Sequence, residues 1–228
     1  ATSGIGKAIA FGLACEGEYN LALCGRNEEK MKSIVEKLEY VVPADAGIFA
    51  RTFDLTNEAD SIQFVHEVVE RFGTVDVLIN NAGANTAKGK VEDIKTEDFE
   101  YMLKLNAVAP FVFMREVVPV LKAKKSGMVM NILSSSCLYA SEMAGSYTAS
   151  KSTLDAMAKV LRREMRPYNV KVCSVYPGGV DTPFRTNDRP DYLKPKTVAQ
   201  AVINAIKLPD EAAIDEIVVR PFVETNFR

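Results

Sequence analysis

The sequence predicts an α/β fold in which one doubly wound parallel sheet carries helices on both faces. Two observations lead to this fold class. Short apolar runs alternate along the chain with segments of helical periodicity, which is the pattern of βαβ units. A glycine-rich turn at residues 1–6 also opens directly into the first helical segment. No long linker or internal repeat divides the chain, so residues 1–228 are expected to form a single domain.

The expected elements follow from the spacing of apolar residues. Strands are predicted where short apolar runs are bounded by turn-forming residues, and in chain order they are Tyr19–Cys24, Ile48–Phe53, Val75–Ile79, Met128–Leu133, Val170–Tyr176 and Ile217–Val219. Helices are predicted where apolar residues recur three or four positions apart, so that one face packs on the sheet. In chain order they are Lys7–Glu16, Glu28–Glu39, Glu58–Arg71, Thr96–Leu121, Tyr147–Arg166 and Thr197–Ile206.

The glycine turn Ala1–Gly6 has no strand before it, although such a turn normally follows the central strand of the sheet. We therefore expect on the order of ten residues before Ala1 that form this first strand and supply the first glycine of the turn.

Composition and charge exclude several classes of protein. Of the 228 residues, 47% are apolar and 25% are charged, which rules out a disordered or collagen-like chain. The net charge is −2 and no lysine–arginine run is longer than a pair, so a nucleic-acid surface is not expected. The longest uncharged stretch, Ser126–Ser141, contains three consecutive serines and falls short of the ~20 apolar residues of a membrane span.

Cysteine and histidine usage bears on compartment and metal binding. The four cysteines are widely spaced and form no C-x-x-C pair, so they are expected to be reduced packing residues of a cytoplasmic protein. The single histidine, His66, lies in a helical pattern where a surface position is expected. Without a second histidine or a cysteine cluster, no metal site is predicted.

The first candidate site is the turn that contains Gly4 and Gly6. It is either an ordinary tight loop or a turn whose amides hold a pyrophosphate at the positive end of the next helix. In a dinucleotide-binding fold of Rossmann type, the residues after the second strand meet the adenine ribose. Here Gly25 leaves space, and Arg26 offers a fork of donors to a 2′-phosphate, which favours NADP over NAD. Taken alone, Arg26 would be a solvated loop arginine.

Two further segments follow expected strands. Asp54 and Leu55 come after the third strand of the full sheet, and Asn80-Asn81-Ala82-Gly83 comes after the next. The paired asparagines can cap backbone groups, and the small residues leave room for a flat ring. A purely structural loop would have the same composition.

The residues with the clearest chemistry lie beyond a buried strand. That strand leads into Ser134-Ser135-Ser136, and Tyr147 follows thirteen residues after Ser134 at the start of a helix. Lys151 is four residues further on, so the two side chains share one helical face. An ammonium near the phenol lowers the pKa of the tyrosine from about 10 and makes it a usable acid or base near neutrality.

With these motifs in this order, the chain resembles the classical short-chain dehydrogenases/reductases over its whole length. The resemblance implies an oxidoreductase that transfers a hydride between an alcohol and its carbonyl. It implies that Tyr147 is the general acid/base, that Lys151 binds the nicotinamide ribose and lowers the tyrosine pKa, and that Ser134 orients the carbonyl. Asn106 would hold a water for proton relay. The implied cofactor-binding residues are Ser3, Gly4, Ile5, Gly6, Arg26, Asp54, Leu55, Asn81, Ala82, Gly83, Tyr147, Lys151, Pro177, Gly178, Val180 and Thr182.

The C-terminal segment Ile214–Pro221 points to one branch of the family, because it is similar to members that include NADP-dependent 3-hydroxy acid and serine dehydrogenases. Two other functions stay open. One is a non-catalytic redox sensor, which needs the cofactor loops but not the full tyrosine, lysine, serine and asparagine set. The other is an isomerase or dehydratase on the same scaffold.

Two expectations concern partners. Cys137, Leu138, Tyr139 and Met143 lie near the catalytic residues in sequence and suggest a moderately apolar pocket for a small-molecule substrate. The long helical segments Thr96–Leu121 and Tyr147–Arg166 carry apolar residues on more than one side. By resemblance, a homodimer or homotetramer is expected.

Overall fold

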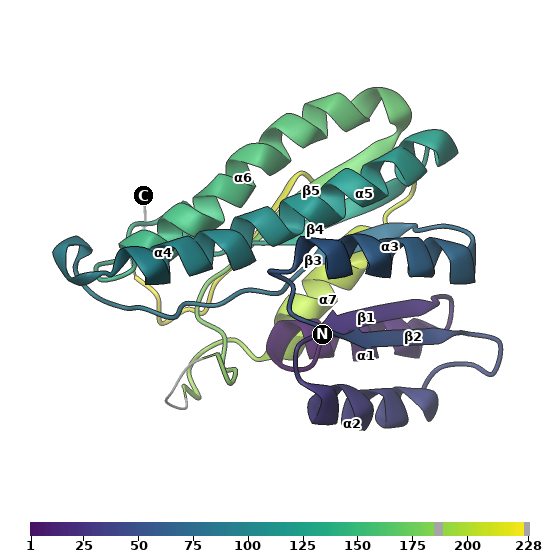
Figure 1. Ribbon diagram of the computed structural model, residues 1–228, viewed down its shortest axis with the longest axis horizontal. Helices are drawn as coiled ribbons and strands as arrows, with labels where there is room; N and C mark the ends of the chain where they lie inside the picture. Colours follow the sequence, from purple (N-terminus) through teal and green to yellow (C-terminus); the bar gives the residue numbers. More distant parts are fainter. Residues whose placement is uncertain (185–188, 226–228) are drawn as a thin grey trace.

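The computed structural model describes residues 1–184 and 189–225, and it shows parallel strands between two layers of helices (Figure 1). Every expected strand is present, with bounds that differ by one or two residues. The strands are β1 Leu21–Gly25, β2 Ile48–Thr52, β3 Val77–Asn80, β4 Gly127–Ile132, β5 Val170–Pro177 and β6 Glu216–Val219. The expected α/β fold class is confirmed.

The helices also follow the apolar periodicity of the sequence. They are α1 Gly4–Glu16, α2 Glu28–Glu39, α3 Glu58–Phe72, α4 Thr96–Leu103, α5 Ala109–Lys124, α6 Gly145–Met165 and α7 Pro195–Ile206. Shorter helical turns are η1 Val91–Asp93, η2 Lys104–Val108, η3 Ser135–Cys137 and η4 Arg166–Tyr168. Asn27 and Asn57 cap α2 and α3, because each side chain accepts a hydrogen bond from a backbone N–H in the first turn.

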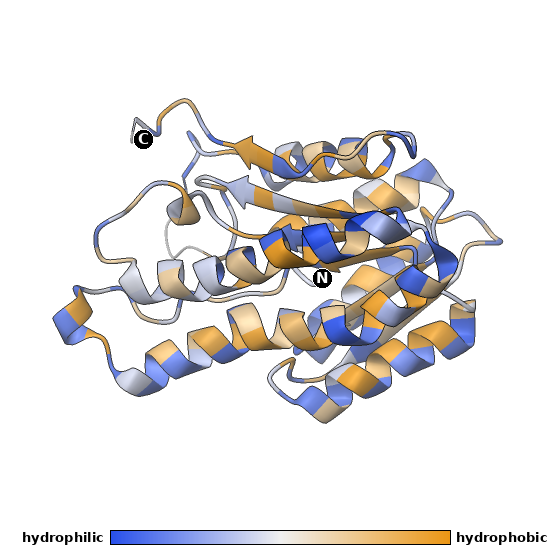
Figure 2. Ribbon diagram, turned by 90° about the horizontal axis from the view of Figure 1, so that it is seen from above, coloured by the Kyte–Doolittle hydropathy of each residue, from blue (hydrophilic) through white to orange (hydrophobic). Residues whose placement is uncertain are grey.

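Two apolar cores lie on opposite faces of the strands. One is formed with α1, α2 and α7 and includes Leu13, Leu38 and Val202. The other is formed with α3, α5 and α6 and includes Phe64, Val117 and Leu154. Figure 2 shows why apolar cores form on both faces: the strands are largely apolar, while most helices alternate polar and apolar residues. Amphipathic helices bury one side on the sheet and leave the other to solvent.

The expected helix Thr96–Leu121 is in fact three elements. The π-helical turn η2 lies between α4 and α5, and Pro110, which has no N–H to donate to the preceding turn, follows it by two residues. A π turn adds one residue to a helical turn, so it shifts the side chains that follow around the helix axis. Asn106 lies within this π turn.

The sheet has a gap between β1 and β3. Among the described residues, β1 pairs only with β2, and β3 pairs only with β4 in the order β3-β4-β5-β6. A cavity of about 320 Å³ lies between the two open edges and is lined by both strands, by α1 and by α5. Ala22, in the middle of β1, is exposed for the same reason. The gap lies next to Ala1, at the place where the sequence predicts a further strand.

None of the helices in the described part of the chain is long and apolar enough to cross a membrane.

Candidate active site

The candidate residues converge because the strands are parallel. Asn81–Gly83 follow β3, Ser134 follows β4, and Gly178–Thr182 follow β5, so all lie at one edge of the strands. Helix α6 begins at the same edge and carries Tyr147 in its first turn. Residues that are up to about a hundred positions apart in sequence therefore surround one site.

The glycine turn lies against two of these segments. Gly4 has a left-handed φ of +53°, and a β-carbon there would lie 3.3 Å from the Thr182 methyl group. A β-carbon on Gly6 would collide with the Asn81 amide. Ser3 is the N-cap of α1, and the first turn of this helix carries no acidic side chain. The positive helix end is thus free to attract an anion such as a pyrophosphate.

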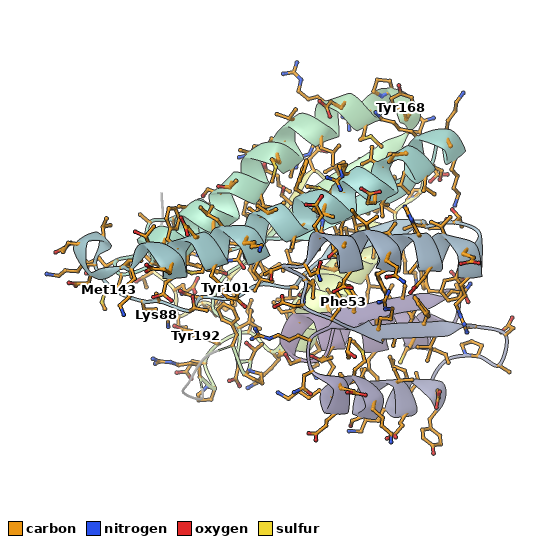
Figure 3. The ribbon with its side chains drawn as sticks, viewed as in Figure 1. Phe53, Lys88, Tyr101, Met143, Tyr168 and Tyr192 are labelled. Atoms are coloured by element: carbon orange, nitrogen blue, oxygen red, sulfur yellow. The ribbon has the colours of Figure 1, made fainter. Side chains whose placement is uncertain are left out.

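Arg26 and Asp54 lie at the ends of β1 and β2. The Arg26 guanidinium donates a hydrogen bond of 3.0 Å to the hydroxyl of Tyr101 on α4, which Figure 3 shows on the lower side of that helix. Asp54 accepts the Thr56 N–H at 2.9 Å, and this bond, with the nearby charges of Arg26 and Lys104, lowers the pKa of the carboxyl. Leu55 lines the cavity beside β1. Arg26 itself is exposed and stands where an anion can reach it.

Asn106 is the centre of a buried hydrogen-bond cluster. It is fully buried in the π turn, and its carbonyl oxygen accepts the Ala84 N–H at 2.9 Å. Its amide donates to the Ala84 carbonyl at 2.8 Å and to the Ser150 hydroxyl at 2.9 Å. These bonds fix the loop after β3 to the start of α6. A β-carbon on Gly83 would lie 3.0 Å from the Asn106 carbonyl oxygen and 3.1 Å from the Lys151 ammonium, so only glycine fits there without a shift.

Lys151 reaches the same point from α6. Its ammonium donates to the Ile132 carbonyl at 2.8 Å, two residues before Ser134, and the residue is only 4% exposed. Burial disfavours the charged form and lowers the pKa of Lys151 to about 8. An ammonium with few water molecules around it acts more strongly on a nearby phenol or ribose hydroxyl than an exposed one does.

Ser134 follows β4, and Tyr147 lies in the first turn of α6. The Ser134 hydroxyl accepts hydrogen bonds from the Ser136 N–H at 3.2 Å and from the Ser136 hydroxyl at 3.0 Å, which orients it at the end of β4. Ser135 begins the helical turn η3. Tyr147 lies one turn before Lys151, and its ring centroid is 6.0 Å from that of Phe184.

The segment after β5 is held by backbone hydrogen bonds. Pro177 ends β5, and the Gly178 N–H donates to the Val219 carbonyl of β6 at 2.8 Å. Val180 is buried in the core formed with α1 and α7. Thr182, two residues later, lies beside the glycine turn, where a β-carbon on Gly4 would meet it. This segment connects the Gly4 turn with the surroundings of Tyr147.

The structure places the glycine turn beside Asn81 and Thr182, and Gly83 beside Asn106 and Lys151, while Arg26 and Asp54 lie at the ends of β1 and β2. Four residues for which the sequence predicts no role also contact these segments. Tyr101, Phe184, Arg220 and Glu224 contact Arg26, Tyr147 or the segments beside them. None stands in a motif with a fixed spacing to the residue it contacts. Of the four, Arg220 lies in a segment with a sequence signal, because Ile214–Pro221 resembles one branch of the family.

Comparisons with known proteins find relatives over nearly the whole chain. The model of the short chain dehydrogenase family matches residues 1–193. An uncharacterized oxidoreductase from Staphylococcus aureus is 31% identical over 229 residues, which cover 97% of this chain and 94% of that protein. Similar solved structures include an alcohol dehydrogenase from the archaeon Thermococcus sibiricus complexed with 5-hydroxy-NADP, with a TM-score of 0.91 at 28% identity over 100% of this chain and 96% of that one. Serine dehydrogenase from Escherichia coli shares the fold, with a TM-score of 0.85 at 22% identity over 98% and 96% of the two chains.

Proposed function

The chain belongs to the short-chain dehydrogenase family, and from this premise we propose that it is an NADP(H)-dependent oxidoreductase that interconverts a small alcohol or hydroxy compound and its carbonyl. The observation that carries the proposal is the convergence of the Lys151 ammonium, Asn106 and Gly83 at the end of β4, with Tyr147 one helical turn away. In this proposal residues 1–228 act as one dinucleotide-binding domain.

The residues present fit a dinucleotide. The turn at Gly4 and Gly6 combines a left-handed backbone with the N-terminus of α1, which suits a pyrophosphate. At Gly83 an added β-carbon would also crowd its neighbours, among them the ammonium of Lys151, which is expected to bind the nicotinamide ribose. Asn81 lies beside Gly6 and Thr182 beside Gly4, and Ser3 is the N-cap of α1. By the family resemblance, Ile5, Ala82 and Val180 also belong to this cofactor site.

The proposed preference for NADP over NAD rests on the residues at the end of β1. Gly25 and Arg26 stand where an acidic residue would accept hydrogen bonds from a free ribose diol. The Tyr101 hydroxyl holds one nitrogen of the Arg26 guanidinium and leaves the rest of its planar fork for a 2′-phosphate. The Thermococcus sibiricus relative, crystallised with 5-hydroxy-NADP, supports the same preference.

The chemistry needs a proton donor and acceptor beside a hydride carrier, and the bound cofactor supplies or accepts the hydride. Tyr147 gives its phenolic proton to the carbonyl oxygen in reduction and takes it from the hydroxyl in oxidation. Lys151 stabilises the phenolate with its positive charge, and Ser134 hydrogen-bonds the substrate oxygen. Asn106, already bonded to Ala84 and Ser150, holds the π turn in place and provides a site for a relay water.

Cofactor binding gives the sharpest test. Arg26→Ala is expected to weaken NADP binding by about 1.5–3 kcal/mol, the range for a hydrogen bond to a charged group, and to leave NAD binding nearly unchanged. Arg163→Ala, at an exposed position on α6, is the matched control and should change neither. Fluorescence titration of the wild type and both variants with the two cofactors measures this. Equal affinity of the wild type for NAD and NADP would contradict the proposed preference.

Turnover separates an enzyme from a redox sensor. Incubating the protein with NADPH or NADP and a panel of carbonyls and alcohols should give a change at 340 nm that requires a substrate. Tight cofactor binding with no turnover across the panel would favour the sensor. Conversion of a substrate without net change in the cofactor would favour an isomerase or dehydratase.

A further inference from the structure

The chain after β6 turns back over the loops that follow β4 and β5, and two charged side chains hold it there. Arg220 and Glu224 form an ion pair of 3.0 Å between Nε and Oε2, with side chains 11% and 19% exposed. Between them, Phe222 and Val223 are exposed. Apart from the buried ring of Pro221, the segment is therefore anchored by its charges and not by its apolar side chains.

Glu224 contacts the segment after β5. Its Oε1 accepts the Gly179 N–H at 2.6 Å, a charge-assisted hydrogen bond to the backbone. A β-carbon on Gly178 would lie 3.0 Å from Pro221 and close to the Glu224 carboxylate, and one on Gly179 would collide with the ring of Tyr192. The two successive glycines thus let the C-terminal segment approach the backbone from one side and Tyr192 from the other.

Arg220 contacts the loop after β4. Its guanidinium carbon lies 4.2 Å from the centroid of the Tyr139 ring, well within the range of a cation–π interaction. Tyr139 is tied to the serine loop in turn, because its N–H donates to the Ser135 carbonyl at 2.8 Å. One ion pair therefore links the loop that carries Ser134 with the segment that follows Pro177.

We propose that Arg220 and Glu224 are positioning residues that set the separation between the serine loop and the Gly178–Thr182 segment. The proposal rests on the proposed function, in which Ser134 holds the substrate oxygen, and on the family resemblance, which implies that the cofactor-binding segment Gly178–Thr182 meets the nicotinamide. Neither side chain touches the reacting atoms in this view. Glu224 acts through the Gly179 backbone, and Arg220 acts through the Tyr139 ring.

The expected consequence is a change in kcat with little change in binding. If the nicotinamide and the substrate oxygen are held on loops that the ion pair joins, loosening it misplaces the hydride donor relative to its acceptor. A displacement of about 1 Å in such a geometry costs on the order of a hundredfold in rate. The adenine end of the cofactor, which Arg26 is proposed to hold after β1, lies outside the two loops that the ion pair joins.

The experiment compares Glu224→Ala, Glu224→Gln and a control, Glu211→Gln, at an exposed position before β6. Glutamine keeps an acceptor for the Gly179 N–H but removes the charge that pairs with Arg220. With NADPH and a substrate from the panel, kcat should fall about tenfold to a hundredfold in Glu224→Ala and less in Glu224→Gln, with KM and the Kd for NADPH within about threefold of wild type. Glu211→Gln should match the wild type. A kcat for Glu224→Ala within about twofold of wild type would overturn the proposal.

A second measurement does not depend on turnover. Hydrogen–deuterium exchange, followed in peptides that cover residues 134–140 and 177–184 of the cofactor-free protein, should become faster in both peptides in Glu224→Ala and in Glu224→Gln, and in neither for Glu211→Gln. Unchanged exchange in the 134–140 peptide would refute the link between the two loops even if the Glu224→Ala protein were too unstable for kinetics. A wild type that binds NADP but turns over no substrate, with both peptides responding, would count against the proposed function and leave the link between the loops standing.

Discussion

The pH dependence of stability offers a direct test of the environment of Lys151. The side chain is 4% exposed, and burial lowers its pKa from 10.5 to about 8. Because one pKa unit corresponds to about 1.4 kcal/mol, keeping this ammonium charged near pH 7 costs the folded protein about 3 kcal/mol. Between pH 8 and 10.5 the unfolded chain binds this proton and the folded protein does not. The free energy of unfolding should therefore rise with pH across this window.

The magnitude follows from the two pKa values. The burial of Lys151 destabilises the folded state by about 3 kcal/mol at pH 7 and by about 1 kcal/mol at pH 9.5. The wild type should therefore gain about 2 kcal/mol of unfolding free energy over this interval from this group alone. Lys151→Met has a side chain of similar length that does not titrate. Terms that do not change with pH, such as the lost hydrogen bond to the Ile132 carbonyl, cancel when the two pH values are compared.

The assay is urea unfolding of the cofactor-free wild type, Lys151→Met and Lys32→Met at pH 7 and pH 9.5, at one protein concentration. Lys32 is exposed on α2, so its variant controls for the loss of a lysine and should follow the wild type. The difference in unfolding free energy between wild type and Lys151→Met should move by about 2 kcal/mol in favour of the wild type as the pH rises. A difference that stays constant within about 0.5 kcal/mol would refute the argument that Lys151 is buried as a costly cation.

Three further expectations concern the chemistry, the backbone and assembly. Tyr147→Phe should abolish turnover, while its thermal unfolding temperature and its affinity for NADP should stay close to those of the wild type. In the wild type, the steady-state rate of alcohol oxidation should rise with pH and the rate of carbonyl reduction on the same substrate pair should fall. Gly127 has a φ of +123°, and an added β-carbon would lie 2.7 Å from the Asp76 carbonyl oxygen. Gly127→Ala should therefore lower the free energy of unfolding, measured by urea denaturation, by roughly 2–4 kcal/mol. Gly73→Ala is the control and should cost about 1 kcal/mol, because φ is +76° there and the space around it is open. The exposed apolar side chains Val108, Phe111 and Val160, on η2, α5 and α6, should be covered in a dimer or tetramer, so light scattering that gives a monomer at micromolar concentration would contradict this expectation.

The sequence by itself determined the parts of this protein that depend on neighbouring residues. Apolar periodicity located the strands and most of the helices, because a strand repeats every two residues and a helix every 3.6. The same local spacing put Tyr147 and Lys151 on one face of α6. The family resemblance assigned Asn81, Ser134 and Thr182 to one site, and the positions of all three just after parallel strands agree with that assignment.

Other features depended on packing between segments far apart in the chain. Pro110 gives a local signal that the expected helix Thr96–Leu121 is irregular, but the bonds that hold the π turn run from Asn106 to Ala84 and Ser150 on other elements. Arg26 and Tyr101 are separated by 75 positions in sequence. Arg220 and Glu224 meet the loops after β4 and β5 only because β6 pairs beside β5 and directs the chain back over them. Periodicity records how a segment contacts its own neighbours, whereas these contacts are decided by where the tertiary structure places two distant segments.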